Sequence, residues 1–271
     1  MSMEHEVHKF SWVGSGEMYL DHPATSRLNR MVIGRYGGNT AAGAEKNEDG
    51  VYVLSELDGG WEFAMLLDAH HTAESAELLV RTINGKAGEI IRLLALPVQQ
   101  AFRELEAFLL SIFQAESFLQ QCQQVTGETA CLICVRLENY LWWFSVGDNS
   151  IYLLHPELAA RGQYLLNQRN FYEWIGFVNT FSQPVACYSS GIRELRQGRN
   201  IIVMTTDGLL EVGARLLEDP RRLYEAFTGR EDLEECVAEI LTGVHEQLGR
   251  DSATVVAWSY DNGKAGAMPS D

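Results

Sequence analysis

The sequence predicts an α+β fold in which two antiparallel β-sheets pack face to face and helix pairs cover their outer faces, a four-layer αββα sandwich. Three observations predict it. Apolar runs come in pairs separated by short turns, as in antiparallel hairpins; amphipathic helical segments lie between these pairs; and residues 10–260 contain no internal repeat or low-complexity linker. Because each element must bury its apolar face, we expect sheet against sheet with helices outside, in one domain over residues 10–260.

The first half of the chain contains a glycine-rich turn region, one hairpin and two helical segments. In order, these are the turn region at 34–39, strands at 51–54 and 61–67 joined by a turn at Asp58-Gly59-Gly60, a helix from about Thr72 to Ile83, and a long helix from Leu96 to Gln124 that begins near Pro97. The intervals are short, as expected for neighbouring elements of one domain.

The second half repeats the alternation of strands and helices. In order, we expect a strand at 130–137, a returning strand at 141–154 kinked at Gly147, an irregular segment at 156–199 with a short helix near 171–175, a strand at 200–206, helices at 219–229 and 231–248, and a last strand at 254–258. The remaining residues, Asp261 to Asp271, are polar and glycine-rich and predict a flexible tail.

Charge and composition restrict the partners. The 271 residues include 21 Lys and Arg against 37 Asp and Glu, a formal charge of -16, so the surface repels polyanions and nucleic acid is not an expected partner. The first ten residues lack a basic region followed by an apolar core, and no apolar run has the ~18 residues of a membrane span. We expect a cytoplasmic protein without a membrane partner.

The cysteines favour reduced thiols. The chain has five of them, an odd number, mostly within apolar segments. Cys131 and Cys134 have CxxC spacing, but in an extended strand that spacing sends their side chains to opposite faces. Neither a zinc site nor a redox pair is therefore expected there.

Four short acidic motifs each place an aspartate beside an apolar, strand-like run: Asn47-Glu48-Asp49-Gly50, Asp68-Ala69-His70-His71, Asp207-Gly208 and Arg250-Asp251-Ser252. Each aspartate alone is more readily explained as a turn residue or helix cap. Taken together, oxygen ligands at strand ends around a cleft could hold two hard divalent cations that bind a phosphate and activate water.

In their order, these motifs resemble those of the metal-dependent serine/threonine protein phosphatases of the 2C type, over roughly residues 30–260. Further blocks with the same resemblance are Gly127-Glu128-Thr129-Ala130, Val146-Gly147-Asp148-Asn149-Ser150, Thr205-Thr206-Asp207-Gly208-Leu209 and Asp251-Ser252-Ala253-Thr254-Val255-Val256. The resemblance implies a divergent bacterial-type member of that family.

The resemblance also implies a metal site for two or three Mn²⁺ or Mg²⁺ ions. In the family's scheme Asp68 bridges two ions, the Ala69 carbonyl binds one of them, and Asp207 and Asp251 complete the other. Glu48 and Asp49 would hold metal-bound waters, and Asp148 would contribute to a third, weaker ion. A water bridging two cations would attack phosphorus in line.

The two histidines after Asp68 differ in their expected roles. His70 falls where some members have a histidine proposed as general acid for the leaving alkoxide, and a role outside the catalytic step is an equal alternative. His71 has no counterpart and is expected to be a surface or packing residue. Together with Thr72 it replaces two glycines that commonly follow this motif.

One departure concerns the phosphate. The family usually has an arginine five positions before Asp49, where this chain has Ala44. Arg35 and Lys46 are the nearby candidates to bind the phosphate, although a lysine lacks the bidentate fork of arginine. Other departures are Asn149-Ser150 for a serine-arginine pair and Ser252 for an asparagine.

The resemblance implies a signalling hydrolase that removes phosphate from phosphoserine or phosphothreonine in a protein substrate. The main alternative is a catalytically weak or inactive module that keeps the fold and acts in regulation by binding a partner protein, which Ala44 favours. A nucleotide-directed metallohydrolase is a third hypothesis, disfavoured because the chain lacks a glycine-rich phosphate loop of known spacing.

Overall fold

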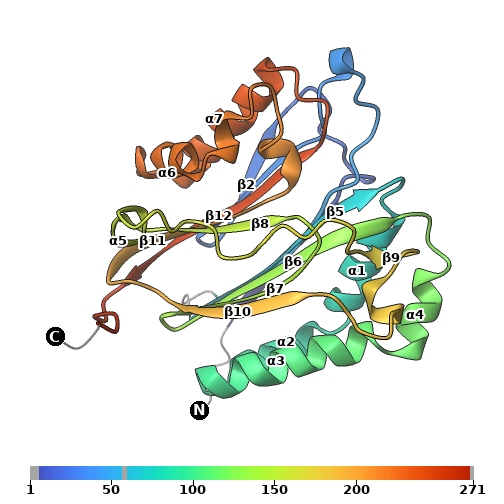
Figure 1. The fold of residues 1–271 in the computed structure, drawn as a ribbon, viewed down its shortest axis with the longest axis horizontal. Coiled ribbons are helices and arrows are strands. Elements are labelled where there is room, and N and C mark those ends of the chain that lie inside the picture. The colour runs from blue at the N-terminus through green and yellow to red at the C-terminus, as the bar shows by residue number, and fades with distance from the viewer. Residues whose placement is uncertain (1–5, 57–59, 269–271) are drawn as a thin grey trace.

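Two antiparallel sheets form the centre of the fold (Figure 1). The computed structural model describes residues 6–56 and 60–268. In this part of the chain the large sheet contains, in spatial order, β1 (Val7–Val13), β4 (Gly50–Glu56), β5 (Trp61–His70), β6 (Glu128–Leu137), β7 (Tyr140–Val146) and β10 (Ser189–Glu194), and β9 (Ile175–Gly176) pairs with β6. The small sheet contains β2 (Ala24–Leu28), β3 (Met31–Tyr36), β12 (Ala253–Asn262), β11 (Gly198–Thr205) and β8 (Ser150–Leu154).

Helices cover the outer face of each sheet, which confirms the predicted four-layer αββα sandwich (Figure 1). The large sheet is covered by α1 (Glu74–Asn84), α2 (Ala87–Leu94), α3 (Val98–Phe113) and α4 (Glu116–Cys122), and the small sheet by α6 (Pro220–Thr228) and α7 (Leu233–Glu246). The remaining helical pieces are α5 (Pro156–Ala159) and the single 3₁₀ turns η1 (Thr40–Ala42), η2 (Thr180–Ser182), η3 (Asp207–Leu209) and η4 (Leu216–Glu218).

Side-chain alternation along the strands divides the buried residues into three cores. In β6, Cys131 faces the helix-covered core of the large sheet and Cys134 faces the core between the sheets, as their spacing predicts. In β11, Val203 packs against α6 and α7 while Met204 faces the core between the sheets. All five cysteines are free thiols.

Several predicted elements have different limits in the structure. The stretch from Leu96 to Gln124 is two helices, α3 and α4, separated at Gln114 and Ala115, and α2 precedes them. The strand predicted at 141–154 is β7 and β8, which belong to different sheets, because Gly147 at φ +90° turns the chain between them. The predicted helix at 171–175 is wrong: the chain there forms turns and enters β9.

Other strands lie where the sequence predicts turns or irregular chain. The fully buried strand β3, Met31–Tyr36, overlaps the predicted turn region at 34–39, and β10 lies in the segment predicted to be irregular. The predicted turn between β4 and β5 includes Asp58 and Gly59, which lie outside the described residues, and the two strands are antiparallel neighbours.

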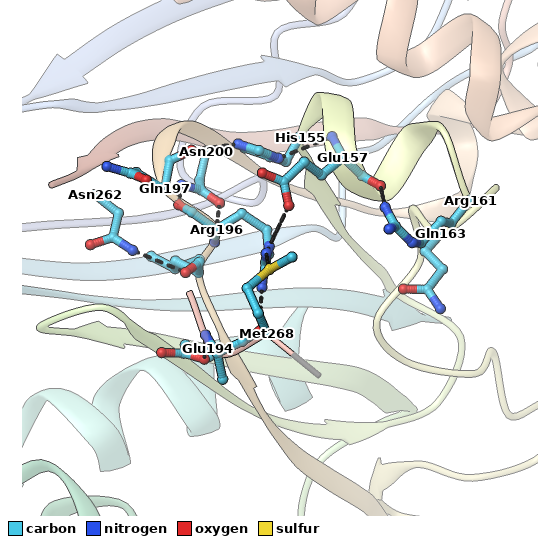
Figure 2. A network of polar contacts seen from close by, with 12 residues as sticks. His155, Glu157, Arg161, Gln163, Glu194, Arg196, Gln197, Asn200, Asn262 and Met268 are labelled. Carbon is cyan, nitrogen blue, oxygen red and sulfur yellow. Dashed lines mark hydrogen bonds and ion pairs between the residues drawn. The ribbon is translucent and has the colours of Figure 1, made fainter. Parts of the chain in front are cut away.

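The C-terminal segment contacts the chain between β10 and β11 (Figure 2). The last strand, β12, continues through Asp261 and Asn262, past the predicted start of the tail. Beyond it, the Arg196 guanidinium donates to the Ala267 carbonyl (3.2 Å) and pairs with Glu157 (2.8 Å). None of the helices in residues 6–56 and 60–268 is both long and apolar enough to cross a membrane.

Candidate active site

Strand alternation brings the buried aspartates together at one end of the core between the sheets. In β5, Leu66 faces this core, and Asp68 follows two positions later on the same face. In β4, Val51 faces the same core and Asp49 precedes it by two positions. Both carboxylates therefore point between the sheets, and both side chains are buried.

Three hydroxyl groups surround the Asp49 carboxylate. Thr206, which directly follows β11, and Thr254 on β12 donate to Oδ2 at 3.2 and 2.6 Å, and Ser252 donates to Oδ1 at 2.9 Å. The Thr206 hydroxyl also accepts from the Thr254 amide at 2.9 Å, which fixes its orientation. These contacts link the first acidic motif of the large sheet to the last two motifs of the small sheet.

Burial without a matching cation leaves this site short of positive charge. Burial raises the pKa of Asp49 to about 7, against the opposing hydrogen bonds from Thr254 and Ser252. Burial likewise raises the pKa of Asp68 well above its ordinary value, and the nearby carboxylates of Asp49 and Asp207 add to the rise. Such carboxylates would be stabilised by any cation that enters.

Two loop aspartates complete the cluster. Asp207 begins η3 directly after β11, and burial, followed by the charges of Asp251 and Asp148, raises its pKa to about 6. Asp251 precedes β12 at the exposed rim, where partial desolvation still raises its pKa. The two loops touch at Gly208: a Cβ on this glycine would lie 1.9 Å from the Ser252 carbonyl oxygen.

Asp148 lies beside an arginine that sequence reasoning did not identify. The Arg169 guanidinium lies 3.8 Å from Asp148, 3.4 Å from Asp207 and 3.0 Å from Glu211, and its Nε donates to the Asp148 carbonyl at 3.1 Å. These carboxylates outweigh the cost of burial and raise the pKa of Arg169. One fixed guanidinium thus partly neutralises the side of the cluster where the resemblance implies a third ion.

The Arg169 loop is held on both sides. Asn167 accepts from the Ile151 amide (3.0 Å) and donates to the Asn149 carbonyl (2.7 Å), and the Asn170 amide donates to the Gly147 carbonyl (3.0 Å). These contacts form between the irregular segment and the β7–β8 turn. Since residues 156–199 have little periodicity, the sequence held no signal that would place Arg169.

The residues after Asp68 form one wall of the site. Ala69 follows on β5 with its side chain in the helix-covered core. His70 is exposed, and its ring centroid lies 6.4 Å from that of Trp174. His71 is exposed at φ +73°, a left-handed conformation that explains why glycine is common at this position.

The two predicted phosphate-binding residues lie in different surroundings. Lys46 is at the rim, where its Nζ donates to Glu48 (2.6 Å) and to the His71 carbonyl (2.7 Å). Arg35 is buried on β3 among aromatic rings, with its guanidinium carbon 4.6 Å from the Tyr19 ring centroid and a hydrogen bond to Ser26 at 3.2 Å. The structure thus brings Lys46, but not the Arg35 guanidinium, to the carboxylates.

The clustered carboxylates are of the ligand type that divalent cations prefer. Asp49, Asp68, Asp207 and Asp251 provide hard oxygen ligands, and burial raises the pKa of each of them, so the residues fit such ions in kind and in location. In residues 6–56 and 60–268, however, no three His, Cys, Asp or Glu side chains are placed to hold an ion as they stand. Side chains would therefore have to shift for these residues to hold an ion.

Comparison with known proteins relates the chain to others by fold. No family model matches the chain, and no curated protein matches it in sequence. Among solved structures, a bacterial serine phosphatase is 12% identical with a TM-score of 0.57, and the match covers 97% of this chain and 100% of that one.

Two other solved structures have functional descriptions. The PstP serine/threonine phosphatase catalytic domain, in complex with two manganese ions, is 12% identical (TM-score 0.55; 94% of this chain, 99% of that chain). PppA of Pseudomonas aeruginosa, a key regulatory component of T6SS, is 13% identical (TM-score 0.60; 88% of this chain, 100% of that chain). The chain thus has the fold of the bacterial serine/threonine phosphatases, which confirms the predicted resemblance to the 2C type at the level of fold.

Proposed function

We propose that this protein is a phosphoprotein phosphatase that hydrolyses phosphoserine or phosphothreonine and depends on Mn²⁺ or Mg²⁺. The observation that carries the proposal is the cluster of Asp49, Asp68, Asp207 and Asp251, with pKa values raised by burial, in a fold shared with bacterial serine/threonine phosphatases. Carboxylates that are crowded together out of water lower stability, so their concentration at one place indicates a binding function.

The residues would divide the work by position. Asp68, Asp207 and Asp251, with the carbonyl of Ala69, would hold the cations, and Glu48 and Asp49 would orient water around them. When bound, two divalent cations would supply Lewis-acid activation of water and of the phosphate. Asp148 would ligate a third ion only after Arg169 has moved away from it.

His70 is the proposed proton donor to the leaving alkoxide. It is exposed at the rim, so a substrate can reach its ring, and the edge contact with Trp174 limits the ring's orientation. A His70→Ala variant should lose more activity on a phosphopeptide than on an aryl phosphate, because a phenolate leaves without protonation more readily than an alkoxide.

The direct test is phosphate release from a phosphopeptide by the purified full chain with Mn²⁺. Release should stop on chelation and return when Mn²⁺ is added back. Asp68→Asn and Asp207→Asn should each abolish release without unfolding the protein, whereas Asp261→Asn, an exposed change on β12, should leave it intact. Full activity in Asp68→Asn would refute the proposed site.

Two observations favour a second function, that of a phosphatase-like module that binds a partner without turnover. Ala44 stands where the resemblance implies an arginine, and Arg169 already pairs with Asp207. Such a module would release no phosphate above a metal-free blank with any phosphopeptide, although it could still bind cations.

A further inference from the structure

A cleft of about 440 Å³ opens beside the acidic cluster, between the loop that precedes β4 and the loop that precedes β12. Its lining residues are Gly43, Ala44, Glu45, Lys46, Glu48, Arg250, Asp251 and Ser252. Ala44 is buried, and its side chain is a single methyl group that brings no charge to the cleft. The cleft thus adjoins Asp251 and contains a second cation, Arg250, besides Lys46.

The backbone around Arg250 is firmly placed. The Gly249 carbonyl accepts from the Asn39 amide at 2.8 Å. At Gly38, which has φ +93°, an added Cβ would lie 2.2 Å from the Arg250 carbonyl oxygen, so the two chain segments are in close contact. This contact fixes the point from which the Arg250 side chain projects.

The Arg250 side chain, in contrast, has no polar partner among the described residues. It is exposed, and no hydrogen bond or ion pair joins its guanidinium to any side chain or carbonyl in residues 6–56 and 60–268. Its Nε lies 3.8 Å from where a Cβ on Gly43 would be, which places the side chain along the wall of the cleft. A fixed backbone with a free guanidinium is the arrangement expected of a ligand-binding arginine.

The other cations near the cluster are already engaged. Lys46 is bound to Glu48 and the His71 carbonyl, and Arg169 to Asp207 and Glu211. With a formal charge of -16, the chain has carboxylates in excess, so a guanidinium left unpaired beside the carboxylates is unusual. Of these cations, Arg250 has the most donors free for an anion.

We propose that Arg250 binds the phosphoryl oxygens of the substrate in this cleft, beside Ala44. The inference rests on the proposed phosphatase function and replaces Arg35 as the candidate anchor. The cleft walls carry two cations, Lys46 and Arg250, against the carboxylates of Glu45, Glu48 and Asp251. A phosphate therefore binds there only after divalent cations have neutralised part of this charge.

The test uses inorganic phosphate as the ligand, so that it does not depend on turnover. With Mg²⁺ present, millimolar phosphate should raise the melting temperature of the full chain, because a ligand of the native state stabilises it. The shift should vanish in chelator and in Arg250→Gln, and should be partly retained in Arg250→Lys, which keeps a charge but not the fork. With a phosphopeptide, Arg250→Gln should raise KM about tenfold, the effect of losing a charged hydrogen-bonded contact.

Arg222→Gln is the matched control, since Arg222 is an exposed arginine on α6 outside the cleft. Arg222→Gln should show the same phosphate-induced rise in melting temperature and the same KM as the unchanged chain. A phosphate shift in Arg250→Gln equal to that of the unchanged chain, or no shift in the unchanged chain with Mg²⁺, would overturn the proposal. If the chain shows an Arg250-dependent shift of the melting temperature but no turnover, the anion site stands and the phosphatase function fails. If Arg250→Gln turns over substrate with an unaltered KM, the phosphatase function stands and the anion site at Arg250 fails.

Discussion

Asp49 links stability to pH through a single enclosed carboxylate. Its pKa is about 7 in the folded protein against an ordinary 3.8, so between these values the folded state binds more protons than the unfolded state. Without divalent cations, the free energy of unfolding should therefore decrease as the pH rises from about 4 to about 7. Asp207, with a pKa of about 6, adds to the same trend.

This trend can be measured by thermal denaturation in chelator from pH 5 to pH 8. The melting temperature should fall across this range, and added Mn²⁺ should reduce the fall. Asp49→Asn carries no titrating carboxyl and should show a weaker pH dependence and a higher melting temperature at pH 8. A slope that is the same in Asp49→Asn and in the unchanged chain would contradict the assignment.

Arg169 is an internal countercharge for carboxylates that would otherwise attract a metal ion. In Arg169→Gln, chelator should lower the melting temperature more than in the unchanged chain, because Asp148 and Asp207 lose their cation. Calorimetric titration should show Mn²⁺ binding that is tighter by about tenfold, or ~1.4 kcal/mol, since no guanidinium has to be displaced. Arg215→Gln removes another arginine that pairs with Glu211 and should leave Mn²⁺ affinity unaltered.

At the scale of single elements, η3 depends on close packing against the closing motif. Gly208→Ala would place a methyl group 1.9 Å from the Ser252 carbonyl oxygen, and we expect a loss of about 1–3 kcal/mol together with displacement of Asp207. Urea denaturation and Mn²⁺ titration should both detect it. Gly243→Ala, in α7 where an added Cβ meets nothing within 4 Å, should instead gain about 0.5–1 kcal/mol.

The success of sequence reasoning differs between types of element. Strands with continuous apolar runs, such as β6 and β11, lie where we predict them, because burial on both faces leaves a plain signal. β10 gave none, since its residues are half-exposed at a sheet edge. The assignment of β7 and β8 to different sheets depends on the turn at Gly147 and on tertiary pairing, which apolar patterning does not encode.

The same distinction applies to the candidate site. Asp49 and Asp68 were predicted from their acidic motifs beside strand-like runs, and alternation along β4 and β5 places both on the face between the sheets. Arg169 could not, because its position comes from hydrogen bonds of Asn167 and Asn170 to a distant turn. Arg250 belongs to the last acidic motif, but only the structure shows that its guanidinium has no polar partner among the described residues.

Across the whole molecule, the core between the sheets has a buried carboxylate at each end. Glu62 and Asp68 lie on the same face of β5, six residues apart. Arg136 donates to both oxygens of Glu62 at 2.6 and 2.8 Å, and its guanidinium carbon lies 4.4 Å from the Tyr260 ring centroid of the other sheet. One end is therefore closed by an internal ion pair, while Asp68 at the other end has no comparable partner among the described residues.

This contrast predicts opposite responses to neutralising the two carboxylates. Glu62→Gln breaks the buried ion pair with Arg136 and should cost about 3–5 kcal/mol, equally with and without Mn²⁺. Asp68→Asn removes a carboxylate whose pKa burial has raised, so in chelator at pH 8 it should be more stable than the unchanged chain. It should also lose the stabilisation that Mn²⁺ provides. Denaturant unfolding with and without Mn²⁺ separates these outcomes. If Mn²⁺ still stabilises Asp68→Asn but no longer stabilises Glu62→Gln, the cation site lies at the Glu62 end of the sandwich and the assignment to Asp68 is wrong.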